Sequence, residues 1–377
     1  MLSYWEQQHF TQYDYLVVGA GLVGITTALS LRELHPDARI GILERGIFPS
    51  GASTKNAGFA CFGSVTELLT DIKEIGEQAT VDLVAQRWQG LKLLRARVGD
   101  HHLDLKQRGG YELLSQEDLS TLESIDRLND LLEPIFGQKV YRDGTHKVKD
   151  FGLNPQKVAA LIENPLEAQL DAGSMMKHLW ALTRIADINL FTGARVTNFQ
   201  ESESLVEVSV DNGMYPVSMT CRRLAVCTNA FSQILLPDVQ VQPGRGIVLI
   251  TKPITGLRIQ GIYHYQQGYY YFRNVGDRIL LGGGRNLDYE GETTTEFGVN
   301  AVILDHLERL LKEMIIPGVP YEIEHRWSGI MGFGSQKTPL IGKVSPDVGY
   351  AVRLGGMGVA LGSLLGDQLA KLLYLNP

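Results

Sequence analysis

The sequence contains few cysteines and no long apolar run. Its 377 residues include three cysteines, Cys61, Cys221 and Cys227, which form neither a CxxC pair nor a metal-binding spacing. We therefore expect reduced thiols, no bound metal and a cytoplasmic location. No stretch approaches the roughly 20 apolar residues that cross a bilayer, and the N-terminus MLSYWEQQHFTQ lacks the basic and apolar regions of a signal peptide. The sequence thus predicts neither an integral membrane segment nor export.

Dense clusters of basic residues are also missing. The chain has 35 Lys and Arg against 42 Asp and Glu, a formal net charge of -7. No segment concentrates positive charge in the way that a nucleic-acid surface requires. We therefore expect a small molecule, and not a nucleic acid, as the partner. A chain of 377 residues is long for a single core, which indicates two domains.

Residues 14–34, DYLVVGAGLVGITTALSLREL, predict a dinucleotide-binding strand, turn and helix. The apolar run 15–18 is typical of a buried parallel strand, and Gly19, Gly21 and Gly24 form a GxGxxG motif before a helical pattern. In such a motif the first glycine permits the tight turn and the second lets a pyrophosphate approach the backbone. The third glycine lets the helix pack closely on the strand.

The next predicted strand supplies an acid at the spacing that this motif requires. This strand covers residues 39–43 and is followed by Glu44, which lies 20 residues after Gly24, where a carboxylate binds a ribose diol. The motif fits both nicotinamide and flavin dinucleotides. Its place at the extreme N-terminus favours FAD.

The patterns in the rest of the chain predict further helices and strands. The last of these, at 350–373, is a second strand followed by a glycine-rich turn and a helix. Helices are predicted over 65–98, 115–132, 171–185 and 295–314, with Ser115 as an N-cap, and strands over 109–115, 189–191, 195–199 and 246–284.

Four segments resemble the FAD-dependent oxidoreductase family that contains D-amino acid oxidase, glycine oxidase, sarcosine oxidase and D-amino acid dehydrogenases. They are GASTKNAG at 51–58, EAQLDAGSMMKHL at 167–179, VCTNAF at 226–231, and TPLIG at 338–342 followed by GGMGVAL at 355–361. The resemblance implies an α/β and α+β fold, with a Rossmann-like, glutathione-reductase-like FAD-binding domain. An interleaved substrate domain would be built on a mostly antiparallel sheet. The FAD-binding domain would comprise 1–70, 152–240 and 325–377, and the substrate domain 71–151 and 241–324.

The resemblance also implies which residues bind FAD. Glu44 would bind the adenosine ribose, Val196 would meet the adenine through its main chain, and 354–360 would cap the pyrimidine end of the flavin. The full implied set is Gly19, Ala20, Gly21, Val23, Gly24, Glu44, Arg45, Ser53, Thr54, Lys55, Asn56, Ala57, Gly58, Phe59, Val196, Thr228, Asn229, Gly329, Leu354, Gly355, Gly356, Met357, Gly358, Val359 and Ala360.

We expect the FAD to be noncovalent. Members of the family that bind flavin covalently use a cysteine shortly before the TPLIG-like segment or a histidine near the N-terminal small-residue run. This chain has Ile330 and Met331 in the first region and Lys55 and Asn56 in the second.

The activity that the resemblance implies is oxidation of the C–N bond of an amine or amino acid. A hydride would pass to flavin N5, the imine would then be hydrolysed, and O2 or another acceptor would reoxidise the flavin. Two alternatives stay open, a 2-hydroxy acid dehydrogenase and an FAD-binding protein without turnover. The oligomeric state is also open. No acid–base triad is required, so His264 and His325 are expected to be structural or surface residues, and Cys61 an inert buried residue.

Substrate recognition departs from the family pattern. Met331 and Gly356 stand where relatives that oxidise small amino acids hold the substrate carboxylate with arginine. Either another cation binds an acid, or the substrate lacks a carboxylate there. The candidate cations are Lys55, Arg245, Arg273 and Arg285, and the candidates closest to the flavin are Lys55, Met331 and Arg285. The tyrosine-rich segment 263–272 is a further candidate, for contact with a bulky or cationic amine.

Overall fold

The chain forms two eight-stranded sheets and one two-stranded sheet in a computed structural model that describes residues 1–203 and 205–375. The first sheet contains β1 (Gln12–Val18), β2 (Ile40–Glu44), β8 (Asn189–Thr192), β9 (Arg195–Glu201), β10 (Val206–Asp211), β11 (Pro216–Val226), β17 (Leu340–Lys343) and β18 (Val348–Val352). Its order is β17-β18-β11-β1-β2-β8, and β10 and β9 extend it from β11. The central pairs are parallel, as a nucleotide-binding half requires.

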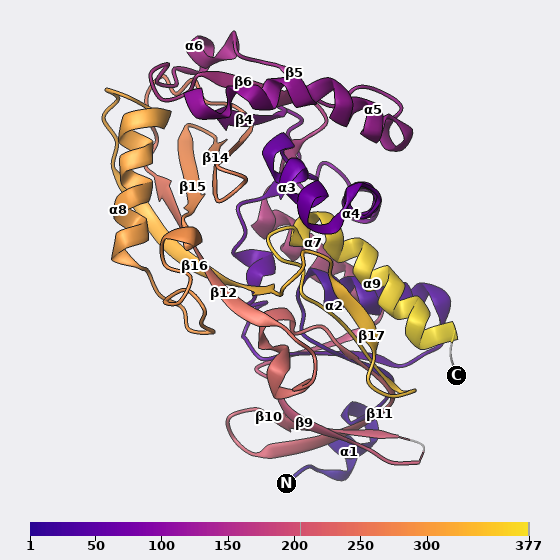
Figure 1. Cartoon of the computed structure of the whole chain (residues 1–377). Helices are drawn as coiled ribbons and strands as arrows, with labels where there is room; N and C mark the ends of the chain where they lie inside the picture. The colour runs from indigo at the N-terminus through magenta and orange to yellow at the C-terminus, as the bar shows by residue number, and fades with distance from the viewer. Residues whose placement is uncertain (204, 376–377) are drawn as a thin grey trace.

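Helices cover one face of this parallel sheet (Figure 1). They are α2 (Leu22–Leu34), α7 (Ala172–Ile185) and α9 (Gly358–Leu375), while α1 (Tyr4–Phe10) lies at the N-terminus beyond β1. The β1 strand and helices α2 and α9 contribute apolar side chains to one buried cluster. The helices therefore hold the sheet through a shared core.

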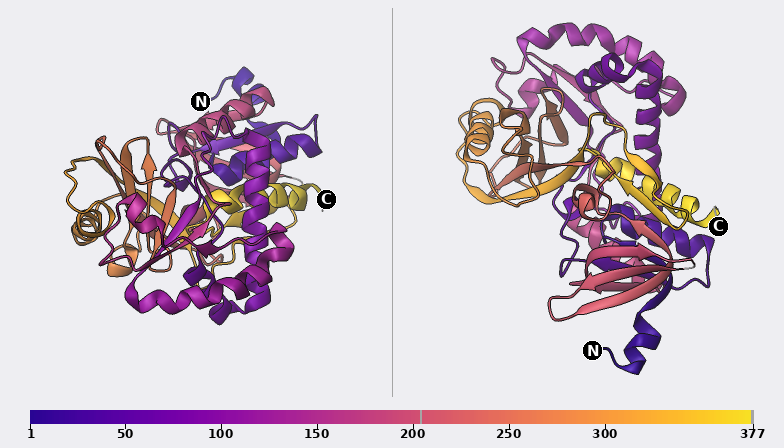
Figure 2. Two further views of the ribbon diagram at one scale, coloured as in Figure 1. Left: turned by 90° about the horizontal axis from the view of Figure 1, so that it is seen from above. Right: turned by 60° about the horizontal axis from the view of Figure 1, so that its bottom comes forward.

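The second sheet is mostly antiparallel. It contains β4 (Gly110–Leu114), β5 (Arg142–Asp143), β6 (Ala160–Asn164), β12 (Gln242–Thr251), β13 (Ile262–Tyr265), β14 (Tyr270–Val275), β15 (Arg278–Gly283) and β16 (Ile323–Phe333). Its order is β16-β12-β15-β14-β13-β4-β6-β5, with one parallel pair, β13 and β4. Helix α8 (Ala301–Leu310) packs on one face, and both views in Figure 2 place this sheet and α8 on one side of the molecule and α9 on the other.

The chain passes between the two sheets more than once, which confirms the predicted interleaved fold. The boundaries of the two domains stay a prediction. Sheet membership differs from them at two places, because β6 and almost all of β16 pair within the second sheet although 152–240 and 325–377 were assigned to the FAD-binding domain.

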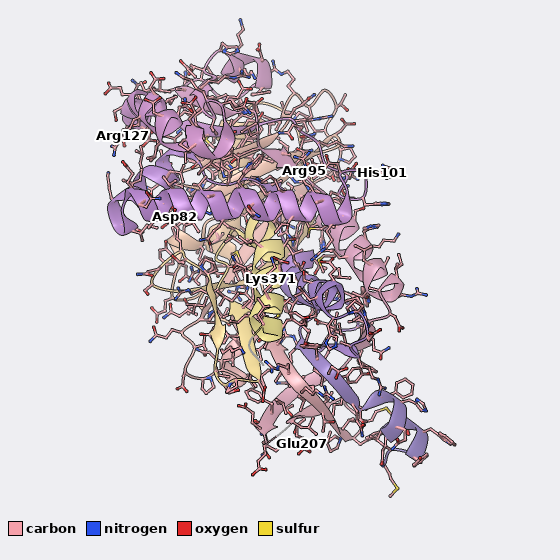
Figure 3. The ribbon with its side chains drawn as sticks, turned by 90° about the vertical axis from the view of Figure 1, so that its right-hand side faces the viewer. Asp82, Arg95, His101, Arg127, Glu207 and Lys371 are labelled. Atoms are coloured by element: carbon pink, nitrogen blue, oxygen red, sulfur yellow. The ribbon has the colours of Figure 1, made fainter. Side chains whose placement is uncertain are left out.

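Two helices replace the single helical pattern at 65–98. Helix α3 (Val65–Ile75) ends at Gly76, whose φ of 87° lies in the left-handed region, and α4 (Glu77–Val98) follows. Figure 3 shows α4 crossing α9, the helix that carries Lys371. The crossing is close, since a Cβ at Gly90 would lie 1.9 Å from the Ala360 carbonyl oxygen.

The structure corrects two predicted helices. Ser115 and Asp118 do form a capping box, but 116–124 is a 3₁₀ helix (η2, Gln116–Ser124) and the α-helix α5 covers Ile125–Phe136. The helix predicted over 295–314 begins only at Ala301. Its N-cap, Asn300, accepts a hydrogen bond from Val302 N and donates two to acidic side chains of the preceding loop, which fixes that loop outside the helix.

The remaining elements are short. They are β3 (Phe59–Ala60), β7 (Ala168–Gln169), α6 (Lys147–Phe151), η1 (Ala52–Thr54), η3 (Asn229–Ile234), η4 (Arg285–Leu287) and the π-helix η5 (Leu311–Ile315). None of the helices within 1–203 and 205–375 has the length and apolar character needed to cross a lipid bilayer.

Two glycines allow α2 and α9 to pack almost backbone to backbone. A Cβ at Gly366 would lie 2.7 Å from the Val23 carbonyl oxygen, and one at Gly362 would lie 2.7 Å from the Leu22 side chain. The two helices consequently begin side by side.

We predict that Gly366→Ala destabilises the protein, because the new methyl group must push α9 away from α2. Such overpacking costs about 1–3 kcal/mol, and equilibrium urea unfolding would measure it. Gln368→Ala is the matched control, since Gln368 is exposed on the same helix and should change stability by less than about 0.5 kcal/mol. Equal stability of the two variants would contradict this account of the helix contact.

Candidate functional site

An elongated cavity runs along the carboxyl edge of the parallel sheet. Its walls include the turn after β1, the end of β2, the loop after β11 and the turn before α9. The first residues of α2 and of α9 both face it. Since helix N-termini carry unsatisfied N–H groups and a partial positive charge, this cavity favours an anionic group at its centre.

The GxGxxG motif has the geometry that its sequence predicts. Gly19 has a φ of 104°, and a Cβ there would lie 2.9 Å from the Cys227 carbonyl oxygen. A Cβ at Gly24 would lie 1.9 Å from Gly19 O, so Gly24 serves helix packing and does not line the cavity. The turn thus brings the backbone around Gly21 to the cavity wall.

Glu44 lies at one end of the cavity, and its carboxylate forms hydrogen bonds with two loops that line it. The carboxylate is 5% exposed, and one oxygen accepts a hydrogen bond from Ala20 N at 3.0 Å. The other oxygen accepts from Gly46 N at 2.9 Å and from Ser50 Oγ at 3.1 Å. Glu44 therefore ties the glycine-rich turn to the loop after β2.

Ser53 reaches the N-terminus of α2, whereas its neighbour Thr54 does not. Ser53 Oγ accepts a hydrogen bond from Leu22 N at 2.9 Å. Thr54 Oγ1 donates instead to Pro49 O at 2.8 Å and lies away from the cavity lining. The two hydroxyls were predicted to act alike, and only Ser53 lies where it can meet a phosphate.

The end of the cavity beside Glu44 presents flat and apolar surfaces. The Arg45 guanidinium stacks on the Phe231 ring at 3.7 Å, and Val196 lines the wall nearby. Thr228 Oγ1 is a buried wall atom without a hydrogen-bond partner in the described part of the chain. A bound molecule with a polar group at this point would satisfy it.

The other end of the cavity meets the second sheet. Ile330 and Met331 of β16 line it, together with the turn before α9. Gly246 lies beside Met331, and a Cβ there would come within 2.7 Å of Met331 Cε. The Tyr271 ring lies across Gly282 in the same way and contacts Phe59 edge to face, with ring centroids 5.6 Å apart. Burial raises the pKa of Tyr271 to about 12, so its hydroxyl stays protonated.

The structure brings most of the predicted cofactor residues to one cavity. Those that line it are Gly19, Gly21, Val23, Glu44, Arg45, Ser53, Asn56, Val196, Thr228, Asn229, Leu354, Gly355, Gly356, Gly358 and Val359, together with the candidate Met331. Those outside its lining are Ala20, Gly24, Thr54, Lys55, Ala57, Gly58, Phe59, Gly329, Met357 and Ala360.

Sequence reasoning missed the apolar wall beside Glu44 and Arg45. That wall includes Met175, Ala230, Phe231, Ile234 and Leu235. Ala230 and Phe231 belong to the VCTNAF segment and Met175 to the EAQLDAGSMMKHL segment, so their places in those segments were the available signal. Ile234 and Leu235 lie at the end of η3, where nothing local distinguishes them from core residues.

Two of the four cations that are candidates for binding a substrate carboxylate already form hydrogen bonds or ion pairs within the protein. Arg273 is 8% exposed and donates to Ala57 O at 2.5 Å and Leu170 O at 3.0 Å, and its burial lowers its pKa to about 10. Arg245 forms a two-pronged ion pair with Glu292, both contacts at 2.8 Å. These contacts already use the donors of both arginines within the fold, so their role in substrate binding stays a prediction that the structure does not favour. Lys55 and Arg285 form no ion pair with any described carboxylate.

Only part of the tyrosine-rich segment 263–272 lies on the side of the sheet that faces the cavity. Tyr263, Tyr270 and Phe272 are buried under α8 on the opposite face of the sheet. Only Tyr271 turns toward Phe59 and the cavity side, because neighbouring strand residues alternate between faces. Of the segment's described aromatic side chains, Tyr271 is therefore the candidate for contact with a bulky or cationic amine on this face.

Cys61, Glu167 and His264 form a buried polar cluster behind Phe59. Their side-chain nitrogen, oxygen and sulfur atoms lie within 4.8 Å of one another. Burial alone would lower the pKa of His264, but Cys61 and Glu167 raise it well above its ordinary value. Burial raises the pKa of the Cys61 thiol. His264 and Cys61 are thus both buried, and their structural role stays a prediction.

Residues 14–372 match the family model described as FAD dependent oxidoreductase. The chain belongs to this family. A probable oxidoreductase, OrdL, of Haemophilus influenzae is 20% identical over 380 residues, covering 95% of this chain and 82% of that protein. L-2-hydroxyglutarate dehydrogenase of Escherichia coli is 42% identical, but over 38 residues, 10% of this chain and 9% of that enzyme.

Solved structures of other proteins share the fold of this oxidoreductase. L-proline dehydrogenase from P. horikoshii matches with a TM-score of 0.76 and 18% identity, covering 96% of this chain and 93% of that one. Glycine oxidase from Geobacillus kaustophilus matches with a TM-score of 0.76 and 19% identity, covering 97% and 96%.

The cavity fits FAD, the cofactor of the family. Two helix N-termini face its centre, a buried carboxylate lies at one end, and Thr228 Oγ1 is a wall hydroxyl in need of a partner. At the other end, a Cβ at Gly356 or Gly358 would meet no atom within 4 Å, which leaves the backbone before α9 accessible.

We predict that Glu44→Ala weakens FAD binding at least tenfold, because each hydrogen bond to a charged group contributes about 1.5–3 kcal/mol. FAD fluorescence on titration into apoprotein would measure this change. Asp37→Ala, an exposed carboxylate just before β2, is the control and should leave affinity unchanged. Unaltered affinity in the Glu44 variant would remove this residue from the binding site.

Proposed function

We propose that this FAD-dependent oxidoreductase oxidises the C–N bond of an amine or amino acid. The observation that carries the proposal is that the cavity that fits FAD meets the second sheet at Ile330 and Met331. Glycines let the Met331 and Tyr271 side chains lie close to that sheet, Met331 over Gly246 and Tyr271 over Gly282. In this proposal the substrate binds beside them at the cavity end.

The names of several structural neighbours support this proposal. Glycine oxidase, L-proline dehydrogenase and the iminodiacetate oxidase of Chelativorans sp. BNC1 all take substrates that are amines. The last matches with a TM-score of 0.75 at 18% identity.

In this proposal, Gly21 and the start of α2 bind the pyrophosphate of FAD, Glu44 binds the ribose, and the start of α9 faces the flavin. Bound FAD would supply the acceptor for a hydride from the carbon that bears nitrogen. Met331 at the cavity end, with Phe59 and Tyr271 packed edge to face on the same side of the sheet, would offer apolar surface that excludes water while the substrate is oriented. The substrate leaves as an imine, which water hydrolyses to a carbonyl compound and an amine or ammonia.

A second candidate is a 2-hydroxy acid dehydrogenase, favoured by the 38-residue match to L-2-hydroxyglutarate dehydrogenase. Anaerobic mixing with amines, amino acids and 2-hydroxy acids separates the two. Flavin bleaching with release of ammonia or alkylamine supports C–N oxidation, and bleaching by hydroxy acids alone contradicts it. A flavin that no compound reduces would favour binding without turnover.

We predict that the purified protein is yellow and releases intact FAD when acid-precipitated, because the positions of covalent attachment hold Ile330, Met331, Lys55 and Asn56. Chromatography of the supernatant would identify the flavin. Flavin that stays with the precipitated chain, or FMN in the supernatant, would contradict noncovalent FAD binding.

We also predict that glycine and D-alanine reduce the flavin slowly in anaerobic stopped-flow experiments. The Met331 thioether offers their carboxylate no ion pair, and desolvating that carboxylate costs several kcal/mol. Larger or secondary amines are the comparison and should react faster. Fast reduction by D-alanine would show that a single carboxylate is well anchored elsewhere.

A further inference from the structure

Lys55 and Arg285 lie over one face of the β12–β16 strand pair. A Cβ at Gly329 would lie 3.2 Å from Lys55 Cβ, and one at Gly244 would lie 2.9 Å from Arg285 Cζ. Gly329 pairs with Gly246, and Met331 pairs with Gly244. The Lys55 Cβ and the Arg285 guanidinium thus lie over positions two residues apart on β12, about 7 Å at the usual rise, and Met331, which pairs with Gly244, lies at the cavity end.

Aromatic rings, and not carboxylates, hold these cations in the described structure. Lys55 Nζ lies 4.9 Å from the Phe297 ring centroid. The Arg285 guanidinium lies 5.2 Å from the Tyr289 ring and 4.4 Å from the Phe333 ring. Arg285 Nε is buried without a hydrogen-bond partner among the described atoms. Both side chains therefore retain unused donors for an anion.

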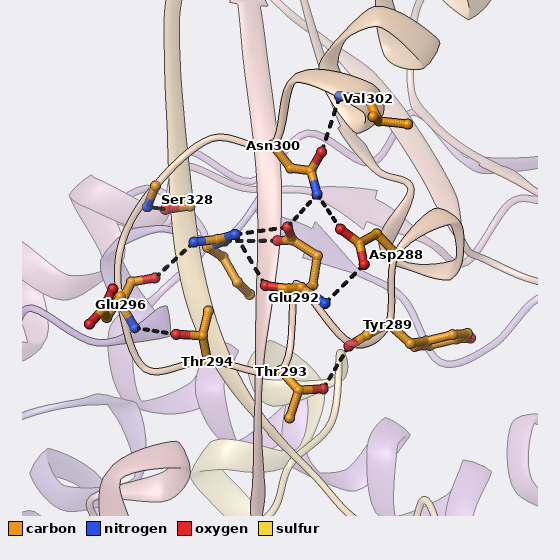
Figure 4. Close-up of polar contacts among 12 residues, drawn as sticks. Asp288, Tyr289, Glu292, Thr293, Thr294, Glu296, Asn300, Val302 and Ser328 are labelled. Atoms are coloured by element: carbon orange, nitrogen blue, oxygen red, sulfur yellow. Dashed lines mark hydrogen bonds and ion pairs between the residues drawn. The ribbon is translucent and has the colours of Figure 1, made fainter.

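One loop supplies a ring to each cation. The 288–300 loop carries Tyr289 and Phe297, and its centre is fixed by the ion pair of Arg245 with fully buried Glu292 (Figure 4). Asn300 donates hydrogen bonds to Asp288 at 2.8 Å and Glu292 at 3.0 Å. The loop is fixed by contacts of its own, so it holds the two cations in place before any ligand binds.

We propose that Lys55 and Arg285 form a two-cation site for an amine substrate with two carboxylates, such as an acidic amino acid or an N-carboxyalkyl amino acid. One carboxylate lies on the Arg285 fork and the other on the Lys55 ammonium, while the C–N bond lies by Met331. This inference rests on the proposed function. It deepens that function because a charge-assisted pair at each end offsets the desolvation of both carboxylates.

Binding without turnover is the first test. Malonate, succinate and glutarate lack an amine, so they can be titrated into the oxidised holoenzyme while the visible flavin spectrum is followed. We expect at least one of them to bind ten- to a hundredfold more tightly than propionate. Arg285→Gln and Lys55→Gln should each remove that preference. Lys252→Gln and Arg278→Gln, exposed cations paired at the surface, are the controls and should keep it.

Reduction of the flavin is the second test. Under anaerobic conditions we expect glutamate, aspartate or iminodiacetate to reduce it at least tenfold more efficiently than glutamine, asparagine or sarcosine. Both enantiomers of each chiral amino acid are tested. The preference should collapse in both variants.

The outcomes separate the two proposals. Amines that reduce the flavin without preference for acids, or variants that keep the preference, would overturn the two-cation site and leave C–N oxidation standing. If no amine reduces the flavin, C–N oxidation fails. Tight dicarboxylate binding that depends on Lys55 and Arg285 would then still support the anion site itself.

Discussion

The close contact between α2 and α9 is the constraint on which the rest of the site depends. Gly362 and Gly366 let the two helices approach, so both begin at the same edge of the parallel sheet. Two helix dipoles then point their positive ends into one cavity. A single nucleotide-binding helix would stabilise only the pyrophosphate region. The second helix, contributed by the C-terminus of the chain, extends the positive potential along the cavity toward Met331.

Hydrogen bonds from one buried arginine and one tryptophan connect the second sheet to the segments beside this cavity. Arg273, on β14, donates to the carbonyls of Ala57 and Leu170, which belong to the loop after η1 and to the segment after β7. The indole of Trp327, on β16, donates to Lys55 O at 2.9 Å. These bonds link the sheet to the loop that follows the nucleotide-binding turn.

The sequence predicted the parts of the site whose conformation depends on neighbouring residues in the chain. The turn at Gly19, the acid at Glu44 and the glycines before α9 depend on short-range rules of backbone geometry and strand ends, and all three lie where those rules place them. Ser53 and Thr54 show where such prediction fails. Their hydroxyls are adjacent in a 3₁₀ turn but point to different sides, and the sequence alone does not separate them. Arg245 and Arg273 show it more strongly. Their partners, Glu292, Ala57 and Leu170, are distant in sequence, so no local pattern distinguishes a paired arginine from an available one.

The same long-range pairing explains why the helix expected from residue 295 starts later. Apolar periodicity continues through the segment, but Glu292 is fully buried against Arg245, and Asn300 bonds to Glu292 and Asp288. Extending the helix back over 295–300 would break these bonds and leave a buried carboxylate with one partner fewer, at a cost of several kcal/mol. The tertiary ion pair therefore outweighs helical propensity, and the residues that it keeps out of the helix include Phe297. Charge pairing in this loop thus determines which side chain lies next to Lys55.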